Sequence, residues 1–404
     1  MKYLIPYCIL GYLILCTINS QAKSTTQLKE NDSLNMEAVK NRPLSNLGQS
    51  NIAIGGYLEA HWQYYSTEGE SKGHQFLLPR MSLFISSSIS ERIQFLSEVE
   101  LEDGGNKIGI EFAALDLQLH PFINLRGGII MNPIGAFNQN HDGPKWEFAE
   151  RPIAMNQMLA ATWSTIGFGS YGKFAKNQWV YAYEAYISGG FDESIIDNTE
   201  GKTFLPASKK NIERFNTISS GLPSFTGKIS IKNRKIGELG LSYMGGIYNK
   251  IIEEGEEVAS KMPLHIAAID FNTKLKWGTK IITEIAYINL ETPEYITPEY
   301  GNAQWGGYID IIQPIYRGEI LNWKQSVLQL ALRLEYVDWN IGKMTQYDNT
   351  IKGEEMWSIM PGISYRPNEK TVIRASYRFR RDYDFLKNPG KNTGGFTFGI
   401  SSYF

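Results

Sequence analysis

The fold is decided by the C-terminal stretch, residues 396–404, FTFGISSYF. Its large apolar residues share one parity: Phe396, Phe398, Ile400 and Phe404. Its small or polar residues share the other: Thr397, Gly399 and Ser401. Because successive side chains of a strand point to opposite faces, this stretch predicts a strand with one apolar and one polar face. Lipid can cover the apolar face of such a strand, so no second protein layer is needed behind it.

The same two-residue period recurs along most of the chain after residue 51. It predicts about sixteen strands, near residues 55–65, 76–88, 92–102, 107–120, 124–131, 160–172, 179–188, 224–233, 238–248, 264–277, 280–290, 304–316, 326–336, 356–365, 371–381 and 394–404. About ten residues are enough for a tilted strand to cross a bilayer. An even number of strands returns the chain to the side on which it started.

The connections between these strands alternate in length. Every second one is short: residues 89–91, 121–123, 173–178, 234–237, 278–279, 317–325 and 366–370. The intervening ones are mostly long: residues 66–75, 132–159, 189–223, 249–263, 291–303, 337–355 and 382–393, with residues 103–106 as a tight exception. This alternation is typical of outer-membrane barrels. We therefore expect an all-β protein, a transmembrane antiparallel β-barrel of outer-membrane type over residues 51–404.

A soluble sandwich or propeller is the alternative all-β fold. It would bury a second face of each strand, and here that face carries Glu, Arg, Gln and Ser. Burying unpaired charges costs several kcal/mol each, so a water-filled interior is favoured. A barrel with about sixteen strands is wide enough to leave an aqueous channel.

Residues 1–22 have the pattern of a secretory signal peptide: a basic start, an apolar run over residues 4–18 and a small-x-small end at Ala22. A membrane-anchoring helix would need a longer apolar run. A lipoprotein site at Cys16 would want a smaller residue than Leu15 before it. We expect cleavage after Ala22 and export to the outer membrane of a Gram-negative bacterium.

Both cysteines, Cys8 and Cys16, fall within this leader, so the mature chain is expected to hold no disulfide and no thiolate metal site. The formal net charge is −2, and it becomes −3 once Lys2 is removed with the leader. This slight negative charge argues against a nucleic-acid partner. Residues 23–50 are polar and without periodicity, which indicates a flexible periplasmic lead-in. No later run of about eighteen apolar residues exists, which excludes a helical membrane protein.

The long connection over residues 132–159 is rich in turn-forming and polar residues. In general porins the third outer loop folds inward and narrows the channel, and this segment has the corresponding place and length. We expect a constriction loop whose solute-selecting side chains are Asn138, His141, Asp142, Trp146, Glu147 and Arg151. The alternative is an external loop held flat over the barrel rim.

Residues 132–152, NPIGAFNQNHDGPKWEFAERP, with Ala161-Thr162-Trp163 and Gly167-Phe168-Gly169, resemble outer-membrane porins of the phosphate-selective O/P type and related Bacteroidetes-like porins. The resemblance is clearest over residues 125–190 and at the C-terminal strand. It implies a sixteen-stranded, usually trimeric, passive channel. Members of the phosphate-selective kind pass anions along lumen arginines and lysines, but that ladder does not map residue by residue onto this chain.

The strand parity itself predicts charged walls inside the barrel. The basic residues expected to line the pore are Arg80, Arg126, Arg333, Arg374, Arg378 and Arg380, with Arg317 beside them. The acidic ones are Glu98, Glu100 and Glu102, which share one face of one strand. Guanidinium groups suit phosphate oxygens, whereas opposed basic and acidic walls orient polar solutes without selecting a sign. General diffusion is favoured, and a preference for anions such as phosphate stays open.

Other classes of function are less well supported. His141-Asp142 and His61 invite a catalytic interpretation, but no GxSxG or HExxH motif occurs and the chain has five histidines in all. No DxDxDG calcium loop occurs either. We therefore expect no enzyme, no cofactor and no metal. A TonB-dependent importer needs about 22 strands and a plug, which this length cannot supply.

The remaining alternative is a gated hydrophobic-solute channel or a surface adhesin on the same barrel, with residues 189–223 and 337–355 binding a ligand. The expected partners are outer-membrane lipid, small hydrophilic solutes and the barrel-assembly machinery, which would recognise the terminal Phe404. A homotrimer is implied by the resemblance alone.

Overall fold

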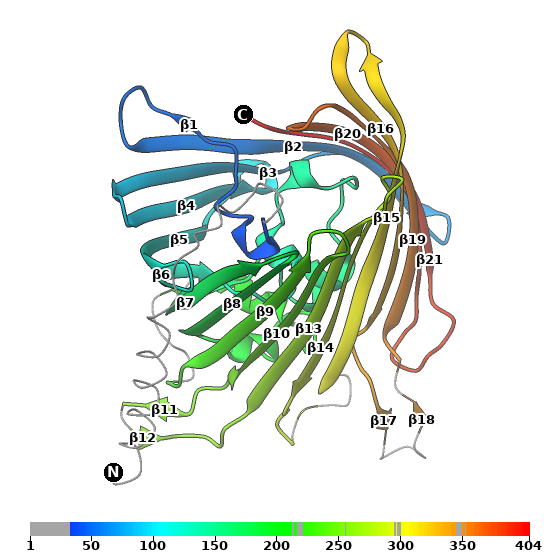
Figure 1. Ribbon diagram of the computed structural model, residues 1–404. Helices are drawn as coiled ribbons and strands as arrows, with labels where there is room; N and C mark the ends of the chain where they lie inside the picture. Colours follow the sequence, from blue (N-terminus) through cyan, green and yellow to red (C-terminus); the bar gives the residue numbers. More distant parts are fainter. Residues whose placement is uncertain are drawn as a thin grey trace. The chain divides into compact units, whose positions relative to one another are not determined.

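Sixteen strands pair in chain order, and the last of them, β21, pairs with the first, β2, so the sheet closes into a ring (Figure 1). All pairings around the ring are antiparallel. The computed structural model describes residues 33–211, 214–215, 221–254, 256–294, 296, 300–344, 350–351 and 353–404. The expected signal peptide, residues 1–22, lies outside the described residues. Residues 34–404 form one unit, which carries the whole barrel.

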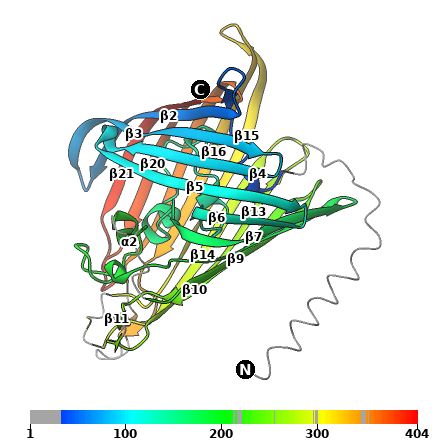
Figure 2. The ribbon, with the colours of Figure 1, turned by 90° about the vertical axis from the view of Figure 1, so that its left-hand side faces the viewer.

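The ring consists of β2 (Ile52–Thr67), β3 (Glu70–Ser90), β4 (Ile93–Glu102), β5 (Lys107–His120), β6 (Ile123–Met131), β7 (Ser164–Lys176), β8 (Trp179–Ser188), β9 (Ser224–Asn233), β10 (Gly237–Ile247), β13 (Pro263–Lys274), β14 (Lys280–Leu290), β15 (Ala303–Ile320), β16 (Trp323–Asp338), β19 (Glu355–Asn368), β20 (Thr371–Asp382) and β21 (Asn392–Tyr403). Figure 2 shows these strands running obliquely side by side around the wall. The predicted fold, an all-β closed antiparallel barrel, is confirmed.

The other elements are short. β1 (Ser45–Asn46) pairs with β2, and two small hairpins, β11–β12 (Ile252–Glu253 and Glu256–Glu257) and β17–β18 (Lys343–Met344 and Thr350–Ile351), lie in long loops. Single helical turns occur at η3 (Asn35–Glu37), η4 (Asp103–Gly105), η5 (Phe137–Gln139), η6 (Gly143–Lys145), η7 (Ala154–Met158), η8 (Glu193–Ile195) and α2 (Pro206–Lys210). Within the described part of the chain, no helix has the length and apolar character to cross a membrane.

The side chains alternate as the sequence predicts. On β21, Phe398 is 47 % exposed on the outer face, whereas its neighbour Thr397 is 1 % exposed on the inner face. On β4, Glu98 and Glu100 are fully buried inside the barrel. The apolar residues therefore face outward and the charged residues inward, the arrangement that a membrane barrel requires.

One expected connection was wrong. Residues 66–75 were expected to form a long loop, but β2 and β3 stay paired as far as Thr67 and Glu70. The turn is made by Glu68 and Gly69, which both have positive φ (50° and 89°). Two such residues give the tight turn whose twist matches that of antiparallel strands. The strands can therefore continue past the membrane-spanning part of the wall.

We call the end of the barrel with the connections 91–92, 121–122, 177–178 and 321–322 the short-turn end, and the other the long-loop end. Residues 23–50 were expected to be a flexible lead-in. Residues 23–32 lie outside the described residues. Residues 34–42 lie against the barrel interior, since Leu34, Met36, Val39 and Arg42 are each less than a tenth exposed, whereas residues 45–50 are exposed. The lead-in thus contributes to the interior of the barrel at the short-turn end.

Candidate functional site

The barrel interior is crossed by the connection between β6 and β7, residues 132–163, which we call the inner loop (Figure 1). Gln139 of this loop donates to the carboxylate of Glu184 on β8, at 2.9 Å. On the far side, Arg374 on β20 donates to the backbone carbonyl of Gly143, at 2.9 Å. Because β8 and β20 are eight strands apart in a ring of sixteen, the loop extends from one wall to the opposite one.

Three arginines on neighbouring strands fasten the inner loop by its backbone. Arg374 donates to the carbonyls of Gly143 and Trp146, Arg366 on β19 to that of Pro144 (2.8 Å) and Arg333 on β16 to that of Glu150 (2.8 Å). Each guanidinium also pairs with a carboxylate, respectively Glu59, Glu147 and Asp310. A planar guanidinium can serve several acceptors at once. We call Arg333, Arg366 and Arg374 the arginine clamp.

Burial alone would raise the pKa of Glu147 in the inner loop, but Arg366 holds it below its ordinary value. The carboxylate therefore stays ionised and keeps its part in the clamp.

The other side of the inner loop is apolar, which the sequence did not predict. The apolar side of the loop consists of Ile153, Met155, Met158 and Trp163. These side chains pack against inward-facing apolar side chains of β10, β13, β14 and β16. These wall residues include Met244, Ile266, Ala268, Ala286, Ile288 and Val337. The ring of Trp163 stacks on that of Phe191, with centroids 4.2 Å apart and planes within 3°. This apolar contact fixes the loop to the wall between β10 and β16, where the backbone N–H groups of Ala136 and Phe137 also donate to Glu284 on β14.

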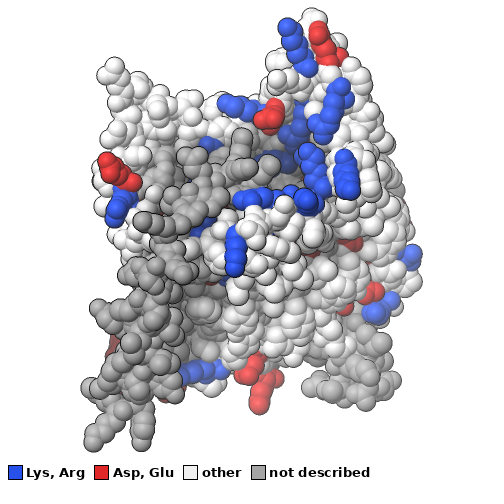
Figure 3. All heavy atoms as spheres, viewed as in Figure 1, with Lys and Arg blue, Asp and Glu red and all other residues white. Residues whose placement is uncertain are grey.

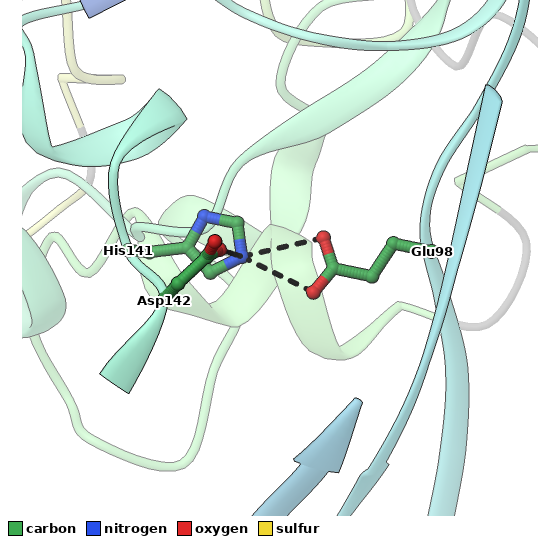
Figure 4. Close-up of side chains that lie close together, drawn as sticks. All are labelled: Glu98, His141 and Asp142. Carbon is green, nitrogen blue, oxygen red and sulfur yellow. Dashed lines mark hydrogen bonds and ion pairs between the residues drawn. The ribbon is translucent and has the colours of Figure 1, made fainter. Parts of the chain in front are cut away.

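His141 and Asp142, two of the expected constriction residues, meet the acidic wall at Glu98 (Figure 4). His141 Nε2 lies 3.4 Å from Glu98. Arg42, from the N-terminal part of the chain, sits between them, with Nη2 2.8 Å from Glu98 and 2.7 Å from Asp142. Burial alone would raise the pKa of Asp142, but Arg42 lowers it well below its ordinary value. This cluster joins the wall, the inner loop and the N-terminal segment.

The other acidic residues of β4 are also paired. Glu100 lies 3.1 Å from Arg80, and Glu102 lies 3.9 Å from Lys209, which is also 3.2 Å from Glu111. Two groups, Glu98–His141–Asp142 and Glu100–Glu102–Glu111, bring three ligand atoms within 4.8 Å of one another and could in principle hold a cation. However, Arg42 already supplies a positive charge to the first group, and Lys209 supplies one to the second.

The basic residues predicted to line the pore are placed inside the barrel but are not free charges. Their carboxylate partners are Glu59 and Glu100 for Arg80, Asp116 for Arg126, Asp310 for Arg333, Glu59 for Arg374, and Glu150 and Glu335 for Arg378. Arg380 is apart from them and pairs with Asp382 at the long-loop end of β20. The parity of the strands predicted where these side chains point, but not that carboxylates would neutralise them.

The remaining expected loop residues hold the loop in shape. Asn138 holds the two ends of the loop together. Its side-chain amide donates to the backbone carbonyls of Asn132 and Trp163 and accepts from the backbone N–H of Trp163. Trp146 packs on Phe137, with ring centroids 4.8 Å apart. The guanidinium of Arg151 lies over the same Phe137 ring, 3.9 Å from Glu100. Asn138, Trp146 and Arg151 are thus buried in the loop's own packing.

The sequence did not single out the basic cavity at the short-turn end. This cavity has a volume of about 720 Å³, and its basic lining residues are Lys145, Lys274, Lys280, Arg317 and Arg366, against one acidic residue, Glu369. We call it the basic vestibule. Figure 3 shows Lys and Arg side chains gathered where the β15–β16 hairpin projects, above a wall with few charges.

The charges of the basic vestibule differ in how they are paired. Lys145 and Arg366 have carboxylate partners in the inner loop. Lys274, Lys280 and Arg317 have none within ion-pair distance among the residues that the structure describes. Strand parity drew attention to Arg317 alone among the three. The place of Lys274 and Lys280 beside the turn 275–279 was the signal in the sequence that could have found them.

Comparisons with known proteins agree with this architecture. No family model matches the chain. An uncharacterised protein of Aquifex aeolicus (strain VF5) is 27 % identical over 361 residues, covering 83 % of this chain and 77 % of its own length.

Among solved structures, an anion-selective porin from Comamonas acidovorans matches 88 % of this chain and all of its own length, with a TM-score of 0.55 and 11 % identity. Salmonella typhi OmpF in complex with daunomycin matches 90 % of this chain and all of its own, with a TM-score of 0.56 and 9 % identity. The DcaP outer-membrane channel of Acinetobacter baumannii matches 87 % of this chain and 97 % of its own, with a TM-score of 0.54 and 11 % identity. The chain therefore has the fold of the outer-membrane porins.

Proposed function

We propose that this protein is a passive outer-membrane channel for small hydrophilic solutes, with a preference for anions such as phosphate. The short turns would face the periplasm and the long loops the exterior, as in single-chain outer-membrane barrels. The inner loop would act as the constriction, since it extends between opposite walls. The resemblance of residues 125–190 to phosphate-selective porins supports the same preference for anions.

The observation that carries the anion preference is the basic vestibule. The arginines of the walls are neutralised in place, so they contribute little net field to the lumen. Lys274, Lys280 and Arg317 are not neutralised in this way, and they face a cavity large enough for hydrated ions. Unpaired charge of one sign at a channel mouth concentrates counter-ions there and repels co-ions.

The alternative, a gated channel for hydrophobic solutes, is supported by the apolar packing around Trp163 and Phe191. The cavity within that packing has a volume of only about 10 Å³. This is about the space that one water molecule needs. A hydrophobic solute would therefore have to displace the inner loop, whereas ions and small polar solutes can enter the vestibule as it stands.

A liposome-swelling series tests the function itself. Proteoliposomes should swell in isotonic sugars at rates that fall as the sugar becomes larger, because the inner loop limits the width of the path. Liposomes without protein supply the background rate. An absence of swelling with every sugar, from protein shown to be folded, would favour a closed channel or an adhesin.

The basic vestibule makes a prediction about selectivity. The triple variant Lys274→Gln/Lys280→Gln/Arg317→Gln should move the reversal potential of the channel, in a KCl gradient, toward that of a cation-selective pore. The effect should be large near 0.1 M salt and small near 1 M, because the screening length falls from about 10 Å to about 3 Å.

The matched control is Arg92→Gln/Lys176→Gln/Lys235→Gln, which removes the same charge from exposed positions elsewhere at the short-turn end. Its reversal potential should stay close to that of the unmodified channel. Equal shifts in the two variants would mean that overall charge, and not the vestibule, sets the selectivity.

A further inference from the structure

The N-terminal residues 34–42, which we call the strap, lie inside the short-turn end of the barrel (Figure 1). At its start, the strap places the backbone N–H of Asn35 3.0 Å from the Glu238 carboxylate on β10. Leu34 and Met36 pack against Tyr171, Val180 and Ala182 of β7 and β8, and Val39 packs against a second cluster on β4, β5, β6 and β8. The strap thus covers the inner wall from β10 round to β4.

The two basic residues of the strap meet carboxylates. Lys40 lies 2.6 Å from Asp116 on β5. Arg42 lies 2.8 Å from Glu98 on β4 and 2.7 Å from Asp142 of the inner loop, and its guanidinium lies over the ring of Phe84. Burial alone would lower the pKa of Arg42, but Asp142 and Glu98 raise it, so the guanidinium keeps its charge.

Without the strap, the wall that it covers would be more acidic, because the strap brings two positive charges, Lys40 and Arg42, and one negative charge, Glu37, which pairs with Lys173 on β7. Among the residues that the structure describes, Glu98 would keep the contact with His141, and Asp116 would keep Arg126 and Tyr171 as partners. Glu238 would lose the backbone N–H of Asn35, from which both of its carboxylate oxygens now accept. The unpaired cations of the basic vestibule lie next to this wall, on β13, β14 and β15. The strap therefore covers the acidic part of the mouth and leaves the basic part uncovered.

We propose that the strap determines the ion selectivity of the channel: Lys40 and Arg42 neutralise the acidic part of the mouth, so that the basic vestibule alone sets the sign of the passing ion. This inference rests on the proposed function. It adds that selectivity depends on a segment outside the ring of strands. The ring itself does not require the strap, because the first strand of the ring, β2, begins at Ile52, after the strap has ended.

The test uses two variants of the full chain in planar bilayers: Lys40→Gln/Arg42→Gln, and a deletion of residues 34–42. Both should move the reversal potential in a KCl gradient toward cations, and the deletion should also raise single-channel conductance. Arg92→Gln/Lys176→Gln removes the same charge as Lys40→Gln/Arg42→Gln, but from exposed positions, and should leave both quantities unchanged. Retention of a compact, heat-modifiable form on gels shows that each variant has folded.

Accessibility of the strap gives a second readout. Val39→Cys, buried in the strap, should react slowly with a polar thiol reagent, and faster once Lys40→Gln/Arg42→Gln is added. A faster reaction together with an unchanged reversal potential would overturn the proposal, as would an unchanged reversal potential in the deletion variant. If the unmodified protein forms no channel at all, it is the proposed function that fails, so the two failures are distinguishable.

Discussion

Replacing Arg374 by alanine is expected to raise the conductance of the channel and to destabilise the barrel. Arg374 binds the inner loop through the carbonyls of Gly143 and Trp146 and pairs with the buried carboxylate of Glu59. Its loss would weaken the attachment of the loop to β20, where the pair of Arg378 with Glu150 remains, and would leave buried acceptors without a donor. Breaking a buried, hydrogen-bonded ion pair from one side typically costs about 3–5 kcal/mol. Single-channel recording and thermal unfolding in detergent measure the two effects.

Arg380→Ala is the matched control, because it removes the same side chain from the same strand. Arg380 pairs with Asp382, and the side chains of both are about a third exposed, away from the inner loop. An exposed pair of this kind contributes less than about 1 kcal/mol. Conductance should therefore stay as it is in the unmodified channel. A destabilised Arg374→Ala variant with unchanged conductance would show that the inner loop does not limit the path.

Replacing Phe398 by arginine should destabilise the protein in a bilayer. Phe398 lies at the middle of β21, pairs with Trp62 of β2 and points away from the interior. An arginine on the lipid face near the bilayer midplane costs about 2–4 kcal/mol, whereas one near the interface costs about 0–1 kcal/mol. Reversible folding into lipid vesicles, followed by tryptophan fluorescence, gives the free energy directly.

Leu321→Arg provides the comparison for Phe398→Arg. Leu321 is 80 % exposed in the turn between β15 and β16, beyond the apolar part of the wall, so the same new charge should have little effect there. Equal losses at the two positions, or none at either, would contradict the assignment of the outer face of β21 to lipid.

The sequence was sufficient for the ring of strands and the direction of its side chains, because both follow from a local two-residue period. Thr397 inside and Phe398 outside are the clearest case. The two-residue period gave wrong strand boundaries in two places. The Glu68-Gly69 turn was hidden in residues expected to form a loop, and β7 begins at Ser164 rather than near residue 160 because the inner loop extends further.

What the sequence could not supply were the partners of the charged residues. Arg42 meets Asp142 across 100 residues, and Arg374 meets Glu59 across 315. Nothing local to either residue specifies the other, since such pairs depend on how the ring closes and how far the inner loop reaches. For the same reason, parity indicated a lumen with arginines along it, whereas most of those arginines are paired and the unpaired cations lie at the short turns.

We expect the closed barrel to carry ions through an interior that is narrowed by the inner loop and biased by the charges of its mouth. Planar-bilayer recording with the purified, folded protein at 0.1 M KCl should therefore give discrete conductance steps, with a reversal potential displaced toward anions. Protein that migrates as a folded barrel and enters the bilayer, yet gives no steps or a clear cation preference, would contradict this expectation.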